Sequence, residues 1–319
     1  MSKKRLMSLL GQLLMLASFV LIIRKVIQYD IDFTFLSSPW VYAGLLGASL
    51  FFGFSIFLTS FIFRWLIYIL SGAPVSLKLA VPIYCGSNLY KYLPGNFMHF
   101  VGRNRLAVEV KELNHAHVAL ATIMDNIFLC LSALIIAVAC TYNYLIEYIK
   151  MTRVPPYAFA AAGAAAAVLC VLAVIFRRHL RKLIHKGLSI LKKFNYKAMI
   201  RLLGVTALRL LALSATYLAV LALLGQPFGP DLIIKITGIF VISWVIGFLV
   251  PGAPGGLGVR EAILIMFLGK TLNQEILTVS AIVHRVVCIL GDLAAYGMAL
   301  VYTKVSRDTL QAEGTGKYG

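Results

Sequence analysis

Two Pro-Gly pairs, each followed by an arginine, are the residues of this sequence whose types and spacing best suit binding chemistry. Pro94-Gly95 precedes Arg103 and Pro251-Gly252 precedes Arg260, so both stretches have the form P-G-x7-R. Each pair interrupts an apolar segment, because proline and glycine both break helices. The shared spacing has two explanations, an internal duplication or two helices that simply end near a basic interface.

The second break is rich in glycine and leads directly into a new helix. Five glycine or proline residues follow Pro251 within the next seven positions, and Arg260 and Glu261 come next. A helix that starts after such a break has free backbone N–H groups and the positive end of its dipole, which suit phosphate. Arg260 then has three possible roles: bidentate contact with phosphate, an ion pair with a carboxylate, or a position at the interface. Glu261 is suited to neutralise an arginine while the site is empty.

Ionisable residues also occur inside the apolar segments, where a charge is costly and is expected to face protein or a wet cavity. An Asp125–Arg285 pair would be a structural latch, whereas a protonatable Asp125 or His284 would couple transport to a proton gradient. The segment before the first break carries Asn88 and Lys91. The full set of such residues within the later spans is Asp125, Arg209, His284, Arg285 and Asp292.

Known catalytic and metal-binding motifs are absent from the sequence. It contains no G-x-S-x-G, no H-E-x-x-H, no P-loop and no dinucleotide-binding glycine loop. The five cysteines lie in apolar stretches without a C-x-x-C motif or a histidine at ligand spacing. We therefore expect no metal, no cofactor and no enzyme activity. The alternative is a membrane transferase that modifies a lipid carrier, with Asp125, Glu261 or His284 as its base.

The elements that position these residues are predicted to be membrane spans. Hydrophobic residues make up 61% of the 319 residues and charged residues only 13%, against about 25% charged in a soluble domain. Mean hydropathy is +0.89, which excludes a soluble fold. The net charge of +18 would suggest nucleic acid in a soluble protein. Here the basic residues flank apolar runs, so topology and anionic headgroups explain them, and no nucleic-acid partner is expected.

The apolar runs predict an all-α polytopic protein with about six full spans and two broken, re-entrant segments. Segment 75–105 contains the first break, and segment 232–268 contains the second and ends in a half-helix, 262–268, too short to cross about 30 Å of hydrocarbon. Residues 1–303 thus form one transmembrane domain and 304–319 a polar tail. The predicted full spans are residues 6–23, 39–65, 117–140, 155–176, 202–224 and 276–302.

Residues 177–201 give the strongest indication of orientation, because they contain nine lysines and arginines and no acidic residue. This predicts a cytoplasmic loop and, with an uncleaved first span, a cytoplasmic N-terminus. Apolar residues recur there at helical spacing, so the loop is either an amphipathic helix on an anionic leaflet or a solvated basic loop. If the two broken segments enter from opposite faces, the two halves form an inverted repeat.

Three stretches resemble the lysylphosphatidylglycerol synthase transmembrane-region family of flippase-like membrane proteins. They are residues 88–95 (NLYKYLPG) leading to Arg103, residues 254–261 (PGGLGVRE), and the pair His284-Arg285. The likeness covers nearly the whole chain in layout, and its specific part lies within 84–126 and 241–296. The resemblance implies substrate contact by Pro94, Gly95, Arg103, Pro254, Gly255, Gly256, Gly258, Arg260, Glu261 and Arg285, and we add the buried polar candidates Asn88, Lys91, Asp125 and His284.

In bifunctional members of that family, a cytoplasmic aminoacyl transferase modifies the lipid that the membrane domain moves outward. Similar stand-alone proteins are associated with other lipids, including lipid-linked sugars and hopanoid-type products. The sequence ends at Gly319 without a transferase domain, so aminoacyl transfer is not implied.

The resemblance leads us to expect translocation of an anionic lipid or a polyprenyl-phosphate-linked glycan across the bacterial cytoplasmic (inner) membrane. The expected partners are membrane lipids and enzymes of envelope or glycan biosynthesis. Apart from the transferase, the rival is a non-transporting scaffold that recruits such enzymes through residues 177–201.

Overall fold

The computed structural model describes residues 38–92, 98–108, 113–151, 194–249, 256 and 258–315. Every regular element in these ranges is a helix. The long helices are α2 (Pro39–Ser71), α5 (His115–Met151), α8 (Tyr196–Leu223), α9 (Pro230–Leu249) and α11 (Gln274–Thr315). The short ones are α3 (Leu77–Asn88), the 3-10 helix η2 (Leu89–Tyr92), α4 (Met98–Val108) and α10 (Val259–Leu268).

The described part of the chain contains five helices that are long and apolar enough to cross a membrane, namely α2, α5, α8, α9 and α11. Large apolar side chains such as Trp40, Leu134 and Val301 are exposed on their outer faces, as expected for surfaces that meet lipid tails. The chain is therefore a multi-pass membrane protein. The predicted spans 6–23 and 155–176 lie outside the described residues.

The start of α8 differs from the prediction, which placed residues 196–201 in the basic loop before a span at 202–224. The helix begins at Tyr196, because the side-chain oxygen of Asn195 accepts a hydrogen bond from the Ala198 N–H at 2.7 Å and caps it. The last two cations of the basic segment, Lys197 and Arg201, are thus in the first turns of a helix. The rest of 177–201, up to residue 193, lies outside the described residues.

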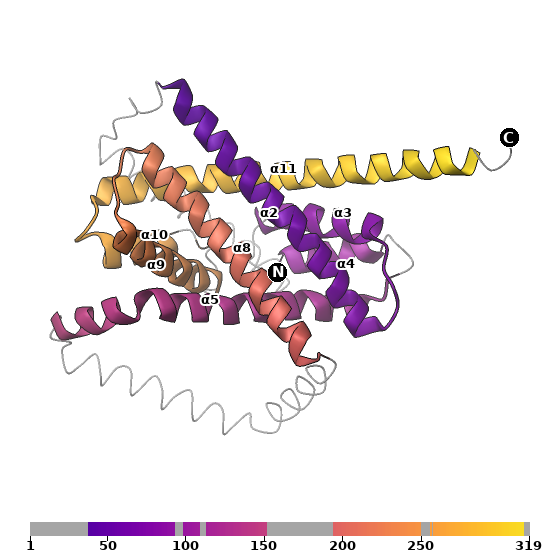
Figure 1. Cartoon of the computed structure of the whole chain (residues 1–319), viewed down its shortest axis with the longest axis horizontal. Helices are drawn as coiled ribbons and strands as arrows, with labels where there is room; N and C mark the ends of the chain where they lie inside the picture. The colour runs from indigo at the N-terminus through magenta and orange to yellow at the C-terminus, as the bar shows by residue number, and fades with distance from the viewer. Residues whose placement is uncertain are drawn as a thin grey trace, which may run out of the picture.

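The four elements α2, α3, α4 and α5 have the same packing relations as α8, α9, α10 and α11. α2 packs against α3, α5 and α11, while α8 packs against α9, α11 and α5. α4 packs against α3 and α5, while α10 packs against α9 and α11. In Figure 1, α2 and α8 run in opposite directions, and so do α5 and α11. The pairs α3/α4 and α9/α10 lie at opposite ends of the molecule in that view.

Two long helices approach each other closely where α2 crosses α11. A Cβ atom on Gly53 would lie 2.5 Å from the carbonyl oxygen of Gly291, and one on Gly291 would lie 2.6 Å from Cδ1 of Phe52. Small residues of this kind let the backbones of membrane helices approach closely. This contact fixes α11, which carries the candidate residues Arg285 and Asp292, against the first half of the chain.

The short helices lie between the long ones and bring polar residues into the interior. α3 packs against both α2 and α11, and its last two turns bury Tyr84, Ser87 and Asn88. At a rise of about 1.5 Å per residue, α3, α4 and α10 are each too short to cross about 30 Å of hydrocarbon. None of the three is therefore long enough to be a full span.

Replacing Gly53 by leucine is expected to destabilise the protein by about 1–3 kcal/mol, because the added side chain overpacks the crossing with α11. Gly47, on the same helix, has no atom within 4 Å of a Cβ position, so Gly47→Leu is the matched control. The measurement is the thermal midpoint of detergent-purified protein by size-exclusion chromatography. Equal midpoints for the two variants would contradict the close crossing.

Candidate functional site

Arg103, at the middle of α4, is almost completely buried, with 2% of its surface exposed. Its Nη1 lies 3.5 Å from Oδ2 of Asp125 on α5, and its Nε donates a hydrogen bond to Oγ of Ser87 at 3.0 Å. The guanidinium lies over the ring of Tyr84, 4.2 Å from the ring centre. A cation buried in apolar surroundings needs partners of this kind, so α4 is held to α3 and α5 through its arginine.

Asp125 receives a second arginine from the other half of the chain. Nη1 of Arg209, on α8, lies 3.8 Å from Asp125 Oδ2. Tyr84 donates a hydrogen bond from its hydroxyl to the same oxygen at 3.2 Å, and Arg209 donates to the Tyr84 hydroxyl at 2.9 Å. The phenol hydroxyl therefore links the two charged groups, because it accepts from the Arg209 guanidinium and donates to the Asp125 carboxylate.

The expected Asp125–Arg285 pair is replaced by a different pairing. Arg285 Nε lies 3.3 Å from Oε1 of Glu261, which is on α10. Glu261 thus neutralises an arginine, as one reading of the sequence anticipated, but the arginine is on α11 and is not its neighbour Arg260. Helix packing brings α10 against α11, and the linear sequence gives no indication of which arginine is reached.

Arg260 lies over the glycines that precede it. Its guanidinium is 5.7 Å from the ring centre of Trp244 on α9. A Cβ on Gly256 would lie 2.8 Å from Arg260 Nε and 2.9 Å from the Gly247 Cα. Gly256 and Gly258 also have positive φ angles of 74° and 81°, a region that glycine adopts without strain. Glycine is therefore needed at positions 256 and 258 for α10 to pack against α9. The Arg260 side chain is closely packed between the two helices.

The first break is joined to the second half by another ion pair. Nζ of Lys91, on η2, lies 2.5 Å from Oδ2 of Asp292 on α11, whose side chain is fully buried. Lys91 itself keeps a side-chain exposure of 34%. Since Asp292 is fixed by the packed helix and Lys91 is on a short 3-10 segment, this pair ties the end of the first broken segment to α11.

Asn88 and His284 have contrasting surroundings. The Asn88 side chain is buried, and its Nδ2 makes no hydrogen bond within the described residues. His284 Nε2 lies 2.9 Å from the Thr216 hydroxyl, and the ring packs edge-on against Tyr217 and Phe240. His284 is therefore part of a packed polar core, while Asn88 has a donor available for a ligand. The candidates Pro94, Gly95, Pro254 and Gly255 lie outside the described residues.

These groups form one region, which we name the interior charge cluster. Arg209 interacts electrostatically with Asp292 as well as with Asp125. Four of the charged side chains also lie close enough to Cys288 to interact with it electrostatically. They are Lys91, Asp292, Arg260 and Arg285. Within the described residues, the cluster consists of five cations and three carboxylates: Lys91, Arg103, Arg209, Arg260 and Arg285 with Asp125, Glu261 and Asp292.

Three of the contacting residues, Tyr84, Ser87 and Arg209, were not among the predicted site residues. Arg209 could have been predicted as a site residue, because an arginine inside an apolar span is expected to face the protein interior. Tyr84 and Ser87 gave no such signal, because such residues are common in apolar helices. Within the described ranges, no group of three or more His, Cys, Asp or Glu side chains is placed to hold a metal.

Replacing Asp125 by asparagine is expected to cost about 3–5 kcal/mol of stability, because it leaves the buried Arg103 and the partly buried Arg209 without their carboxylate. Asp231→Asn is the control, since Asp231 is exposed in the first turn of α9 and its loss removes at most about 1 kcal/mol of helix-dipole stabilisation. Thermal midpoints in detergent measure both effects. An Asp125→Asn midpoint equal to that of Asp231→Asn would show that the buried network contributes little.

Comparison with known proteins gives no family assignment. No protein-family model matches the chain, and no curated protein matches it.

Proposed function

We propose that the protein translocates an anionic lipid, a phospholipid or a polyprenyl-phosphate-linked glycan, between the leaflets of the bacterial cytoplasmic membrane. The observation that carries this proposal is the positive excess of the interior charge cluster. Among the described residues, this cluster holds five cations and three carboxylates, and ionisable groups inside a membrane protein commonly mark a substrate path. A bound phosphate diester or pyrophosphate would offset the excess.

The unsatisfied polar atoms in the cluster support a ligand that carries hydroxyl groups beside its phosphate. Asp125 Oδ1 and Glu261 Oε2 are buried and accept no hydrogen bond within the described residues, and Asn88 Nδ2 donates none. Buried polar atoms without partners cost about 1–3 kcal/mol each. A glycerol or sugar hydroxyl would donate to the carboxylate oxygens, and a phosphate oxygen would accept from the amide.

The arrangement of the two halves supports movement between leaflets. Since α2 and α8 run in opposite directions and the short-helix pairs lie at opposite ends (Figure 1), we infer that the two halves form an inverted repeat with re-entrant broken segments. Such repeats place substrate sites near the bilayer midplane and expose them to either side in turn. The headgroup would occupy the cluster while the tails stay in the bilayer, which avoids the cost of about 2.5–3.5 kcal/mol or more for a charge in hydrocarbon.

The ion pairs are suited to respond to the headgroup. Lys91–Asp292 and Arg285–Glu261 each join an element of a broken segment to α11. A phosphate that draws Lys91 or Arg285 from its carboxylate would loosen that connection on one side of the cluster. The nine cations of segment 177–201 support a cytoplasmic position for that segment and for the N-terminus, by the positive-inside rule.

Leaflet exchange of labelled phosphatidylglycerol and of a labelled polyprenyl-phosphate sugar in proteoliposomes tests the proposal. Arg103→Gln and Arg260→Gln are each expected to slow exchange of the transported lipid by about 10–150-fold, since a charge-assisted hydrogen bond contributes about 1.5–3 kcal/mol. Arg105→Gln, which changes an exposed arginine on the same helix as Arg103, is expected to retain the wild-type rate.

Each other outcome has a definite meaning, provided that size-exclusion profiles show folded protein. Equal rates for all variants would remove the cluster from the transport path. A chemically changed lipid on thin-layer chromatography would favour the membrane transferase. Wild-type protein that exchanges neither lipid, with or without an imposed proton gradient, would contradict translocation.

A further inference from the structure

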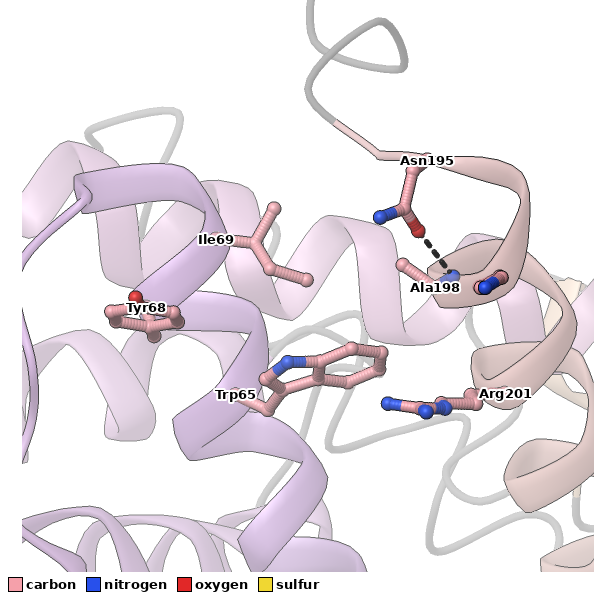
Figure 2. Close-up of a pocket in the computed structure, with 7 residues that line it drawn as sticks. Trp65, Tyr68, Ile69, Asn195, Ala198 and Arg201 are labelled. Atoms are coloured by element: carbon pink, nitrogen blue, oxygen red, sulfur yellow. Dashed lines mark hydrogen bonds between the residues drawn. The ribbon is translucent and has the colours of Figure 1, made fainter.

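A pocket of about 390 Å³ lies where the end of α2 meets the start of α8, and no residue of the interior charge cluster lines it. Figure 2 shows Trp65 on α2 and Arg201 on α8 pointing toward each other across it. Two of the lining residues are cations and none is acidic. The lining residues are Trp65, Tyr68, Ile69, Asn195, Lys197, Ala198 and Arg201.

The geometry of the pocket suits a phosphate that is attached to an apolar body. Lys197 and Arg201 are exposed on the first turns of α8, one helical turn apart, so both cations reach the same opening. The guanidinium group provides paired donors for two phosphate oxygens. Trp65 and Ile69 are half-buried beside these cations, which gives the opening an apolar wall along α2.

The opposite end of the α2–α8 pair is built differently. There, a Cβ on Gly44 of α2 would lie 2.7 Å from Cδ2 of Leu223 on α8, so the two helices are in close apolar contact. One end of the pair is thus closed by a glycine–leucine contact and the other end is open and basic. The two ends of the α2–α8 pair therefore present different surfaces, although the two halves of the chain have matching packing relations.

We propose that this pocket binds the phosphate headgroup of an anionic glycerophospholipid from the leaflet on the side where α8 begins. The pocket lies at the ends of two membrane-spanning helices, where tryptophan and basic residues are typically found at the headgroup level. Exposed apolar residues next to it, Tyr196 and Ile200, provide a surface for the first carbons of the acyl chains. The site is separate from the interior charge cluster and does not depend on translocation.

Trp65 provides the reporter for a test. The sequence has three tryptophans, Trp40, Trp65 and Trp244, so the Trp40→Phe/Trp244→Phe variant leaves Trp65 alone. Its fluorescence is measured in phosphatidylcholine nanodiscs that contain an equal minor fraction of either dibrominated phosphatidylglycerol or dibrominated phosphatidylcholine. Brominated phosphatidylglycerol is expected to quench Trp65 more strongly than brominated phosphatidylcholine.

Adding Lys197→Gln and Arg201→Gln together is expected to weaken the apparent affinity for phosphatidylglycerol at least tenfold, and to abolish its excess quenching. Arg201→Lys, which keeps the charge, is expected to retain most of that excess and guards against a folding defect. Lys304→Gln is the control, since it removes one exposed cation from α11 outside the pocket, and it is expected to change nothing.

Three results would overturn the proposal. The first is equal quenching by the two brominated lipids, which would show contact with lipid in general. The second is an excess that persists in the Lys197→Gln/Arg201→Gln variant, since the two cations would then not hold the headgroup. The third is reversal of the excess by inorganic phosphate but not by sodium chloride of equal ionic strength, which would identify a site for soluble phosphate.

Discussion

The structure depends on one constraint, that charges inside an apolar helix bundle must find partners. Asp125 shows this most fully, since one of its oxygens is shared by Arg103, Arg209 and the Tyr84 hydroxyl. Those residues come from α3, α4, α5 and α8. Because a charge buried among apolar side chains is stable only with partners, the four helices must lie where the network requires them. The broken segments are thus held by polar contacts as well as by apolar packing.

Glycine has a complementary role at the places where backbones meet. Gly53 and Gly291 allow α2 and α11 to cross without intervening side chains, and Gly256 leaves space for the Arg260 side chain against α9. The positions of the charged residues therefore depend on the glycines. Close backbone contact fixes the long helices, and the short helices then present their cations toward the space between those helices.

The two proposed phosphate sites differ in how far their cations are paired with carboxylates, and this difference matches their positions. The interior charge cluster pairs most of its cations with carboxylates, because unpaired charge there is expensive. The pocket between α2 and α8 leaves its cations facing outward without any acidic lining residue, which is tolerable at the headgroup level because water and lipid phosphates are available. An interior site with a moderate charge excess suits a passing headgroup. A more open basic site at one end suits a lipid that stays in its own leaflet.

The sequence by itself determined the helical membrane class, because hydropathy depends on composition over windows of about 20 residues. It also indicated that ionisable residues such as Asp125 and His284 would be buried within the helices. The approximate positions of α2, α5, α8, α9, α10 and α11 followed from the same apolar runs. The starting residue of α8 did not, since the Asn195 cap extended the helix into the basic segment.

Only the tertiary structure decided which charges meet. Asp125 pairs with Arg103 and Arg209, and Glu261 pairs with Arg285. These choices depend on which helices pack together and on how each is rotated, and residues far apart in the chain carry no local signal of either. The same reason explains why Tyr84 and the pocket at Trp65 and Arg201 were not anticipated. Periodicity identifies a helix and its apolar face, but the partner of that face is set by the packing of the whole bundle.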